Sequence, residues 1–189
     1  MKKNLVTAVL MTIATTILFG IIYPFMVTVL AQVLFPNQAN GQLIRREDQV
    51  IGSRMIAQPF TSARYFHPRP SAAGNGYDAA NSGGSNLGPT NQKLVDRVKA
   101  AVVVAQAENP SVPVPIDLVT TSGSGLDPDI SPAAAYFQVP RVARARSVSE
   151  ERLRELVSAH ILPRTIGILG EPRVNVLELN LSLDRVASR

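Results

Sequence analysis

The sequence contains no cysteine and no tryptophan, and it has only two histidines, His67 and His160. The lack of cysteine excludes disulfides, thiolate metal sites and cysteine nucleophiles. A zinc site would need mostly carboxylate ligands, so no metal site is predicted. Aromatic residues make up 5% of the chain and basic residues follow no stripe, so the net charge of +5 indicates a solvated basic surface and no nucleic-acid partner.

Charge is missing from one long stretch, because no Asp, Glu, Lys or Arg lies between Lys3 and Arg45. Residues 5–35 are almost entirely apolar, and a helix of this length measures about 45 Å, more than the roughly 30 Å of a bilayer core. We therefore expect residues 1–36 to form a transmembrane anchor helix and residues 37–189 to form one soluble domain. A cleaved signal peptide ending near Ala31 is the alternative, but its apolar region would be only about 7–15 residues long.

The position of the basic residues favours one orientation of this helix. Lys2 and Lys3 lie directly at its start, whereas Arg45 and Arg46 follow its end at a distance. Since basic residues next to a membrane helix stay in the cytoplasm, we expect a cytoplasmic N-terminus and an extracytoplasmic domain.

Small or weakly polar residues recur at every fourth position of the apolar stretch, at Ala8, Thr12, Thr16, Gly20 and Pro24. In lipid, small residues let helix backbones approach closely and threonine hydroxyls can bond across the interface. The pattern therefore predicts packing against a partner helix, with a kink where Pro24 cannot bond the carbonyl of Gly20. Alternatively, the threonines bond their own backbone and face lipid.

The rest of the chain predicts an α+β fold, a single small domain of mixed helices and strands. Polar, glycine-rich residues 71–89 predict a loop, after an extended segment at 60–70. A helix from Thr90 or Asn91 to Glu108 is expected to bury Leu94, Val95, Val98, Val102 and Ala105. Further helices are predicted after Ser131, interrupted or ended by Pro140, and from Ser147 to about His160. Strands are predicted at residues 50–58, 112–121 and 173–183.

No catalytic constellation is recognisable. The best phosphate-loop candidate is Ser82, Gly83, Gly84, Ser85 and Asn86, where glycines can expose backbone N–H groups to an anion. The lysine of a Walker loop is missing, so a flexible or partner-docking loop is the competing interpretation. Asp129 precedes Ser131 and Pro132, and it is interpreted as a carboxylate at a helix start. Both histidines are interpreted as structural, with His160 at a helix end.

Five stretches together resemble a known family, the C subunit of the Kdp-type potassium-transporting ATPase. They are F-H-P-R-P-S-A at 66–72, S-G-G-S-N-L-G-P at 82–89, G-S-G-L-D-P-D-I-S-P-A-A-A at 123–135, R-V-A-R-A-R at 141–146 and G-E-P-R-V-N-V-L-E-L-N at 170–180. With the N-terminal helix, the resemblance covers essentially the whole chain.

The resemblance implies a single-pass protein of the bacterial inner membrane and an ATP-driven, high-affinity potassium importer. Its partners would be a channel-like A subunit, a P-type ATPase B subunit and a very small F subunit. The C subunit would be needed for assembly and would act as a catalytic chaperone that raises the ATP affinity of the B subunit. It would not be an enzyme and would hold no cofactor tightly, with ATP involved through the B subunit. In agreement, the chain lacks the D-K-T-G motif of P-type pumps.

Two other interpretations stay open. The chain is alternatively a membrane-anchored extracytoplasmic module that binds a small ligand through its glycine-rich loop. A third interpretation is an ATP-binding regulator that faces the cytoplasm.

Overall fold

The computed structural model describes residues 2–187 and confirms the α+β class. The chain divides into two compact units, Met1–Val50 and Ile51–Arg189. The first contains α1 (Lys2–Ile17), a π-helical turn η1 (Leu18–Ile22), α2 (Tyr23–Leu34) and α3 (Pro36–Ala39). β1 (Leu43–Arg46) then pairs with β2 (Gln49–Ser53), in which the chain passes to the second unit.

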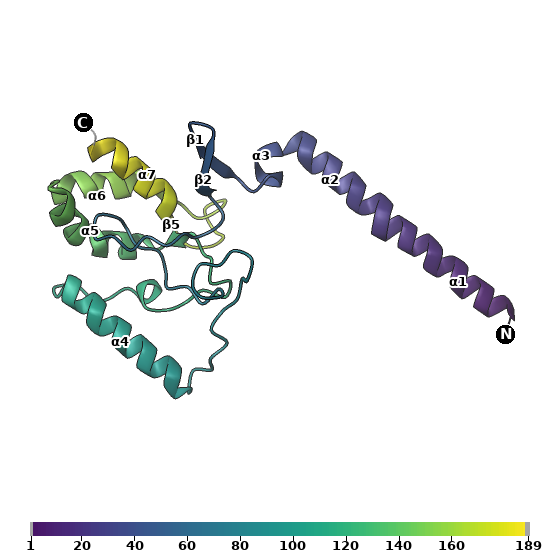
Figure 1. Cartoon of the computed structure of the whole chain (residues 1–189), viewed down its shortest axis with the longest axis horizontal. Helices are drawn as coiled ribbons and strands as arrows, with labels where there is room; N and C mark the ends of the chain where they lie inside the picture. The colour runs from purple at the N-terminus through teal and green to yellow at the C-terminus, as the bar shows by residue number, and fades with distance from the viewer. Residues whose placement is uncertain (1, 188–189) are drawn as a thin grey trace. The chain divides into compact units, whose positions relative to one another are not determined.

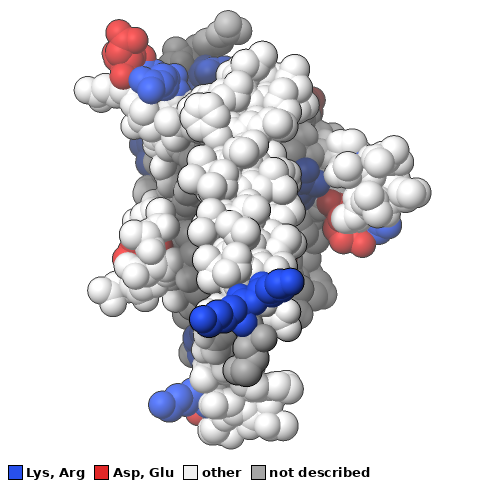
Figure 2. Space-filling model, turned by 90° about the vertical axis from the view of Figure 1, so that its right-hand side faces the viewer, with Lys and Arg blue, Asp and Glu red and all other residues white. Residues whose placement is uncertain are grey.

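The helix from Lys2 to Leu34 is long and apolar enough to cross a membrane, and none of its most apolar window is buried by protein. Figure 2 faces its N-terminal end and shows uncharged surface along the helix, with lysine at the near end. Where the sequence predicts a kink at Pro24, the backbone stays helical and adds the extra residue of η1 just before the proline. Proline is thus accommodated by a π-turn, which shifts the hydrogen-bond ladder by one residue.

The second unit is built around three helices that lie together in Figure 1: α5 (Pro132–Arg146), α6 (Glu150–Ala159) and α7 (Val176–Ala187). A small antiparallel sheet in the order β3 (Asp129–Ile130), β5 (Arg173–Asn175), β4 (Ile161–Leu162) packs with them. Val174 of the central strand is opposite both Ile130 and Ile161. The core contains the following fully buried side chains: Phe66, Val139, Val142, Leu153, Val157, Val174, Leu179 and Leu183.

Several predicted elements are confirmed. Residues 60–89 contain no helix or strand. α4 (Gln92–Glu108) begins after Asn91, whose side chain accepts from the Lys93 N–H. Ser131 caps α5, as its hydroxyl accepts from the Ala134 N–H. α6 also forms, but its cap is Ser149, because Ser147 adopts a left-handed conformation that ends α5.

The predicted strand at residues 173–183 is wrong beyond Asn175. The alternating leucines suggest a strand, but Val176, Leu179 and Leu183 also repeat with helical spacing, and all three are buried on α7. The Asn175 side chain accepts from the Glu178 N–H and caps the new helix. When a short apolar run fits both the strand and the helix period, the elements that it packs against decide which structure it adopts.

Four other predictions need correction. The strand at 50–58 ends at Ser53, and residues 112–121 contain only a 3₁₀ turn η2 (Ile116–Leu118), since Pro113 and Pro115 cannot donate to a ladder. Pro140 does not interrupt α5, because buried side chains on both sides hold the helix together. The predicted stripe of α4 is only half-buried, and no residue of this helix is fully buried.

Candidate functional site

Two buried carboxamides hold the extended segment that contains Phe66 and His67. The Asn180 side chain accepts from the Phe66 N–H at 2.9 Å and donates to the Phe66 carbonyl at 2.9 Å. Gln138 bonds the N–H and carbonyl of His67 in the same way, at 2.7 and 3.1 Å. Each carboxamide thus replaces the missing strand partner of one residue, because it satisfies both the N–H and the carbonyl of that residue. The segment is fixed against α7 and α5 although it belongs to no sheet.

Two arginines of α5 bind the same segment. Arg141 donates to the carbonyls of Ala63 and Tyr65, and its Nε is 2.9 Å from a carboxylate oxygen of Glu108 at the end of α4. Arg146, whose side chain is 3% exposed, bonds the Arg64 carbonyl and pairs with Asp184 at 2.7 Å. Its guanidinium also lies 4.6 Å from the centre of the Tyr65 ring. Hydrogen-bonded guanidinium groups therefore join α4, α5 and α7 through one irregular stretch of chain.

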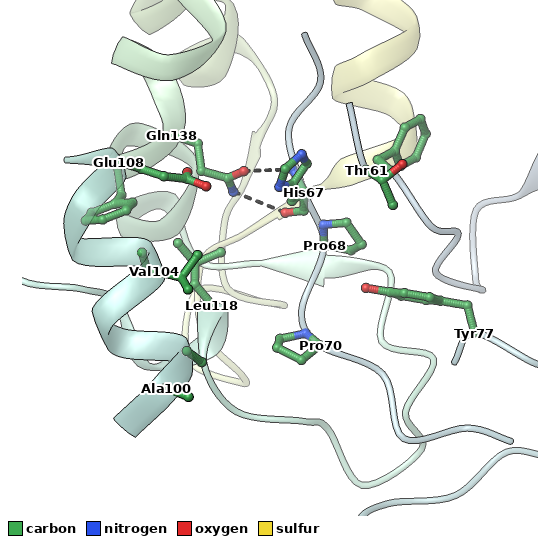
Figure 3. Close-up of a pocket in the computed structure, with 14 residues that line it drawn as sticks. Thr61, His67, Pro68, Pro70, Tyr77, Ala100, Val104, Glu108, Leu118 and Gln138 are labelled. Atoms are coloured by element: carbon green, nitrogen blue, oxygen red, sulfur yellow. Dashed lines mark hydrogen bonds between the residues drawn. The ribbon is translucent and has the colours of Figure 1, made fainter. Parts of the chain in front are cut away.

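A cavity of about 610 Å³ lies between α4 and this segment (Figure 3). Its wall is mostly apolar and includes Val104 and Leu118, while His67, Glu108 and Gln138 contribute polar groups. Burial, and next the charge of Arg141, lower the pKa of His67, so the imidazole is neutral at pH 7. Its Nε2 lies 3.0 Å from the Ser62 carbonyl. The cavity is suited to an apolar group, and His67 is committed to its own backbone.

The glycine-rich loop is packed against a neighbouring loop. The Gly83 N–H and the Ser82 hydroxyl both donate to the Ser124 carbonyl, at 2.9 and 3.0 Å. A Cβ on Gly125, which has a φ of +67°, would lie 2.6 Å from the Gly83 carbonyl, so only glycine fits there. One amide and one hydroxyl of the loop are therefore bonded within the domain. The loop also does not lie at a helix start, because α4 begins only at Gln92. The association of Ser82–Asn86 with nucleotide stays a prediction.

The carboxylate of Asp129 has a role other than the predicted one. Asp129 lies in β3, pairs with Arg173 at 3.0 Å and accepts from the Asn175 side chain, so it does not cap α5. Asp117, which the sequence analysis missed, accepts from both the N–H and the hydroxyl of Ser131. Burial raises the pKa of Asp129, whereas Asp127 forms an ion pair with Arg69.

Within residues 2–187, no group of three side chains is arranged to hold a metal ion. The imidazole of His160 lies 2.8 Å from the Leu156 carbonyl and 2.8 Å from the Ser182 hydroxyl, at the end of α6, as its structural interpretation requires.

The buried carboxamides were not predicted, although the sequence contains a signal for each. Gln138 stands between Phe137 and Val139, and Asn180 between two leucines, in stretches that are otherwise core. A polar side chain at a core position must be hydrogen-bonded. The sequence thus indicates an internal bond at these positions, but not its partner.

The five residues of the predicted membrane stripe lie along one continuous helix. Ala8, Thr12 and Thr16 belong to α1, Gly20 to η1 and Pro24 to α2. All are exposed, and the Thr16 methyl is 3.8 Å from the place of a Cβ on Gly20. The predicted packing of this face stays a prediction.

Known proteins resemble this chain over both of its units. A profile of the family described as "K+-transporting ATPase, c chain" matches residues 5–185. The chain belongs to this KdpC family. It is 64% identical to the potassium-transporting ATPase KdpC subunit of Koribacter versatilis, over 97% of this chain and 95% of the relative. It is also 59% identical to the corresponding subunit of Rhodospirillum rubrum, over 97% of this chain and 96% of the relative.

The match confirms the resemblance read from the five motifs. Within the KdpC family, the motif at 66–72 provides the backbone that Gln138 and Asn180 bind, and the motif at 141–146 provides Arg141 and Arg146. The motifs at 82–89 and 123–135 provide the two loops that pack on each other. All five motifs, the last of which ends at Asn180, thus make structural contacts within one domain.

Proposed function

We propose that this chain is the non-catalytic accessory C subunit of a potassium-transporting ATPase and assembles with A, B and F subunits. The observation that carries the proposal is the family match over residues 5–185, which includes both the apolar helix and the domain. The accessory role is further supported by Arg141 and Arg146, which pair with Glu108 and Asp184, and by His67, whose ring bonds the Ser62 carbonyl, because these polar groups are engaged within the domain.

The test is deletion of the chain in a bacterium that carries the whole pump. Growth on micromolar potassium is expected to stop, and the A and B subunits are expected to separate during purification. Uptake that continues unchanged without this chain contradicts the proposal.

For the topology, we propose one crossing of the bacterial inner membrane with the N-terminus in the cytoplasm and the domain outside. Lys2 and Lys3 at the start of the apolar helix support this orientation. Because the chain has no cysteine, a Gly88→Cys variant carries a single thiol in an exposed loop with open space around it. An impermeant thiol reagent is expected to label it on intact spheroplasts, whereas Asn4→Cys, which keeps both lysines, is labelled only after permeabilisation. The reverse pattern contradicts the orientation.

The proposed catalytic-chaperone role is to raise the ATP affinity of the B subunit. With the domain outside the cytoplasm, ATP does not reach Ser82–Asn86, so we propose that the membrane helices transmit the effect. In addition, the domain would cover the potassium entrance of the A subunit. Two results agree with this route. The KM for ATP stays the same when the Gly83–Ser124 loop contact is broken, and it rises when the membrane helix is altered. The opposite pattern favours direct nucleotide binding by the loop.

A further inference from the structure

The π-turn η1 breaks the hydrogen-bond ladder in the middle of the apolar helix. In an α-helix the carbonyl of Phe19 would accept from the Tyr23 N–H, but this N–H bonds the Leu18 carbonyl. In a π-helix the donor would be residue 24, which is a proline without an N–H. The Phe19 carbonyl therefore loses both of its helical donors, and the Gly20 carbonyl loses its α-helical donor to the same proline.

The open carbonyl lies at the depth where water cannot replace the donor. Sixteen helical residues precede η1 and twelve follow it. The break is therefore close to the centre of the span, far from both headgroup regions. A backbone group without a partner costs several kcal/mol in hydrocarbon. Proline in such helices is tolerated where neighbouring helices, Ser or Thr side chains, waters or a local π adjustment satisfy the freed groups, and here the π adjustment still leaves the Phe19 carbonyl open.

A free hydroxyl lies one turn before the open carbonyl. Four of the five threonines in the span donate to a carbonyl of their own helix: Thr7, Thr12, Thr15 and Thr28, at 2.8 to 3.0 Å. Thr16 makes no such bond within the described residues, and its methyl faces Gly20. Residues three and four apart share a helix face. Thr16, the Phe19 carbonyl and Gly20 therefore belong to one side of the helix.

Glycine leaves this side open. The Thr16 methyl is the one side-chain group of the described chain within 4 Å of a Cβ placed on Gly20. A second helix can therefore approach the backbone closely, as small residues permit in membranes.

We propose that a transmembrane helix of another pump subunit docks at this break through a hydroxyl or carboxamide side chain. Such a group donates to the Phe19 carbonyl and accepts from the Thr16 hydroxyl, which satisfies both with one residue. An apolar partner would leave both groups unpaired. The inference rests on the proposed membrane-spanning accessory role, and it adds the chemistry of the partner and the atoms that it meets.

The Phe19 carbonyl can be observed alone, because Phe19–Gly20 is the only Phe–Gly step in the sequence. Labelling with carbonyl-¹³C phenylalanine and ¹⁵N glycine thus isolates one carbonyl resonance by solid-state NMR. The chain is compared alone in bilayers and in the assembled pump in the same bilayers. A hydrogen bond moves a carbonyl resonance downfield, so a downfield shift is expected only in the pump. The same shift in both samples, or in neither, overturns the inference; in the first case a second copy of the chain supplies the donor.

A matched pair of variants tests the hydroxyl. Thr16→Val removes the unpaired hydroxyl and Thr28→Val removes one that bonds its own helix, and neither makes membrane insertion less favourable. Retention of the chain on a tagged B subunit is expected to fall about three- to tenfold for Thr16→Val, the range for one interhelical hydrogen bond, and to stay unchanged for Thr28→Val. Pro24→Ala restores an N–H donor to the helix and is expected to lower retention as well.

The outcomes separate the two proposals. A retained wild-type chain with equal retention of Thr16→Val and Thr28→Val overturns the partner chemistry alone. A wild-type chain that is not retained on the tagged subunit overturns the accessory role, and the inference with it.

Discussion

Truncation of Asn180 to alanine removes one of the two carboxamides that hold the extended segment. Asn180 is 1% exposed, and both of its bonds go to the backbone of Phe66, which is itself 0% exposed. The Asn180→Ala variant leaves an N–H and a carbonyl buried without partners. Water cannot replace the lost partners without opening the core around Phe66.

The cost follows from these two groups. A buried backbone group left without a partner costs about 1–3 kcal/mol, so the pair costs about 2–6 kcal/mol. The whole free energy of unfolding of a domain is about 5–15 kcal/mol. We therefore expect Asn180→Ala to remove a large share of the stability of the second unit.

Urea unfolding of the full chain in detergent micelles, followed by tyrosine fluorescence, measures this loss. With a loss of about 4 kcal/mol and a slope of about 2 kcal/mol per molar urea, the midpoint falls by about 2 M. Gln92→Ala is the matched control, because this exposed carboxamide on α4 bonds only the side chain of Asp96. Its midpoint is expected to stay within about 0.3 M of the wild type. If both variants have the same midpoint, the carboxamide of Asn180 does not hold the segment.

Three further substitutions are expected to change the stability of the second unit. Burial and Arg141 lower the pKa of His67, so the unfolded chain binds a proton that the folded chain excludes. The free energy of unfolding therefore falls as pH drops below 6.5, and His67→Gln is expected to reduce this fall in urea titrations. Arg146→Lys loses the forked bonds and the ring contact and costs about 2 kcal/mol, whereas exposed Arg154→Lys costs about 0.5 kcal/mol or less by the same assay. Gly125→Ala costs about 3 kcal/mol because of its clash and positive φ, whereas Gly123→Ala, with open space around it, changes thermal stability little.

Each expectation has an outcome that contradicts it. Parallel pH profiles for His67→Gln and the wild type exclude the imidazole as the titrating group. Equal losses of stability for the two arginine variants mean that the forked hydrogen bonds of Arg146 contribute nothing beyond its positive charge. Equal melting temperatures for the two glycine variants mean that the two glycine-rich loops do not pack on each other.

The local elements with strong end signals were predictable. The helix after Asn91 and the helix after Ser131 both begin at the predicted caps, since a side-chain oxygen followed by free N–H groups is a local signal. In contrast, residues 176–183 form a helix because their leucines must meet the α5 and α6 core, and the sequence of that stretch fits either period. Asp129 likewise left its predicted cap role because the strand places it beside Arg173.

The sequence by itself determined the apolar span, the family and the absence of cysteine chemistry, because these depend on composition and on residues that are neighbours in the chain. Only the tertiary structure decided which backbone groups Asn180, Gln138 and Arg141 satisfy, since those partners lie 71 to 114 residues away for the two carboxamides and 76 for the Tyr65 carbonyl. The π-turn lies between these cases. The sequence shows that Pro24 has no N–H to donate to the Gly20 carbonyl. Only the backbone path shows that the Tyr23 N–H bonds the Leu18 carbonyl and leaves the Phe19 carbonyl open.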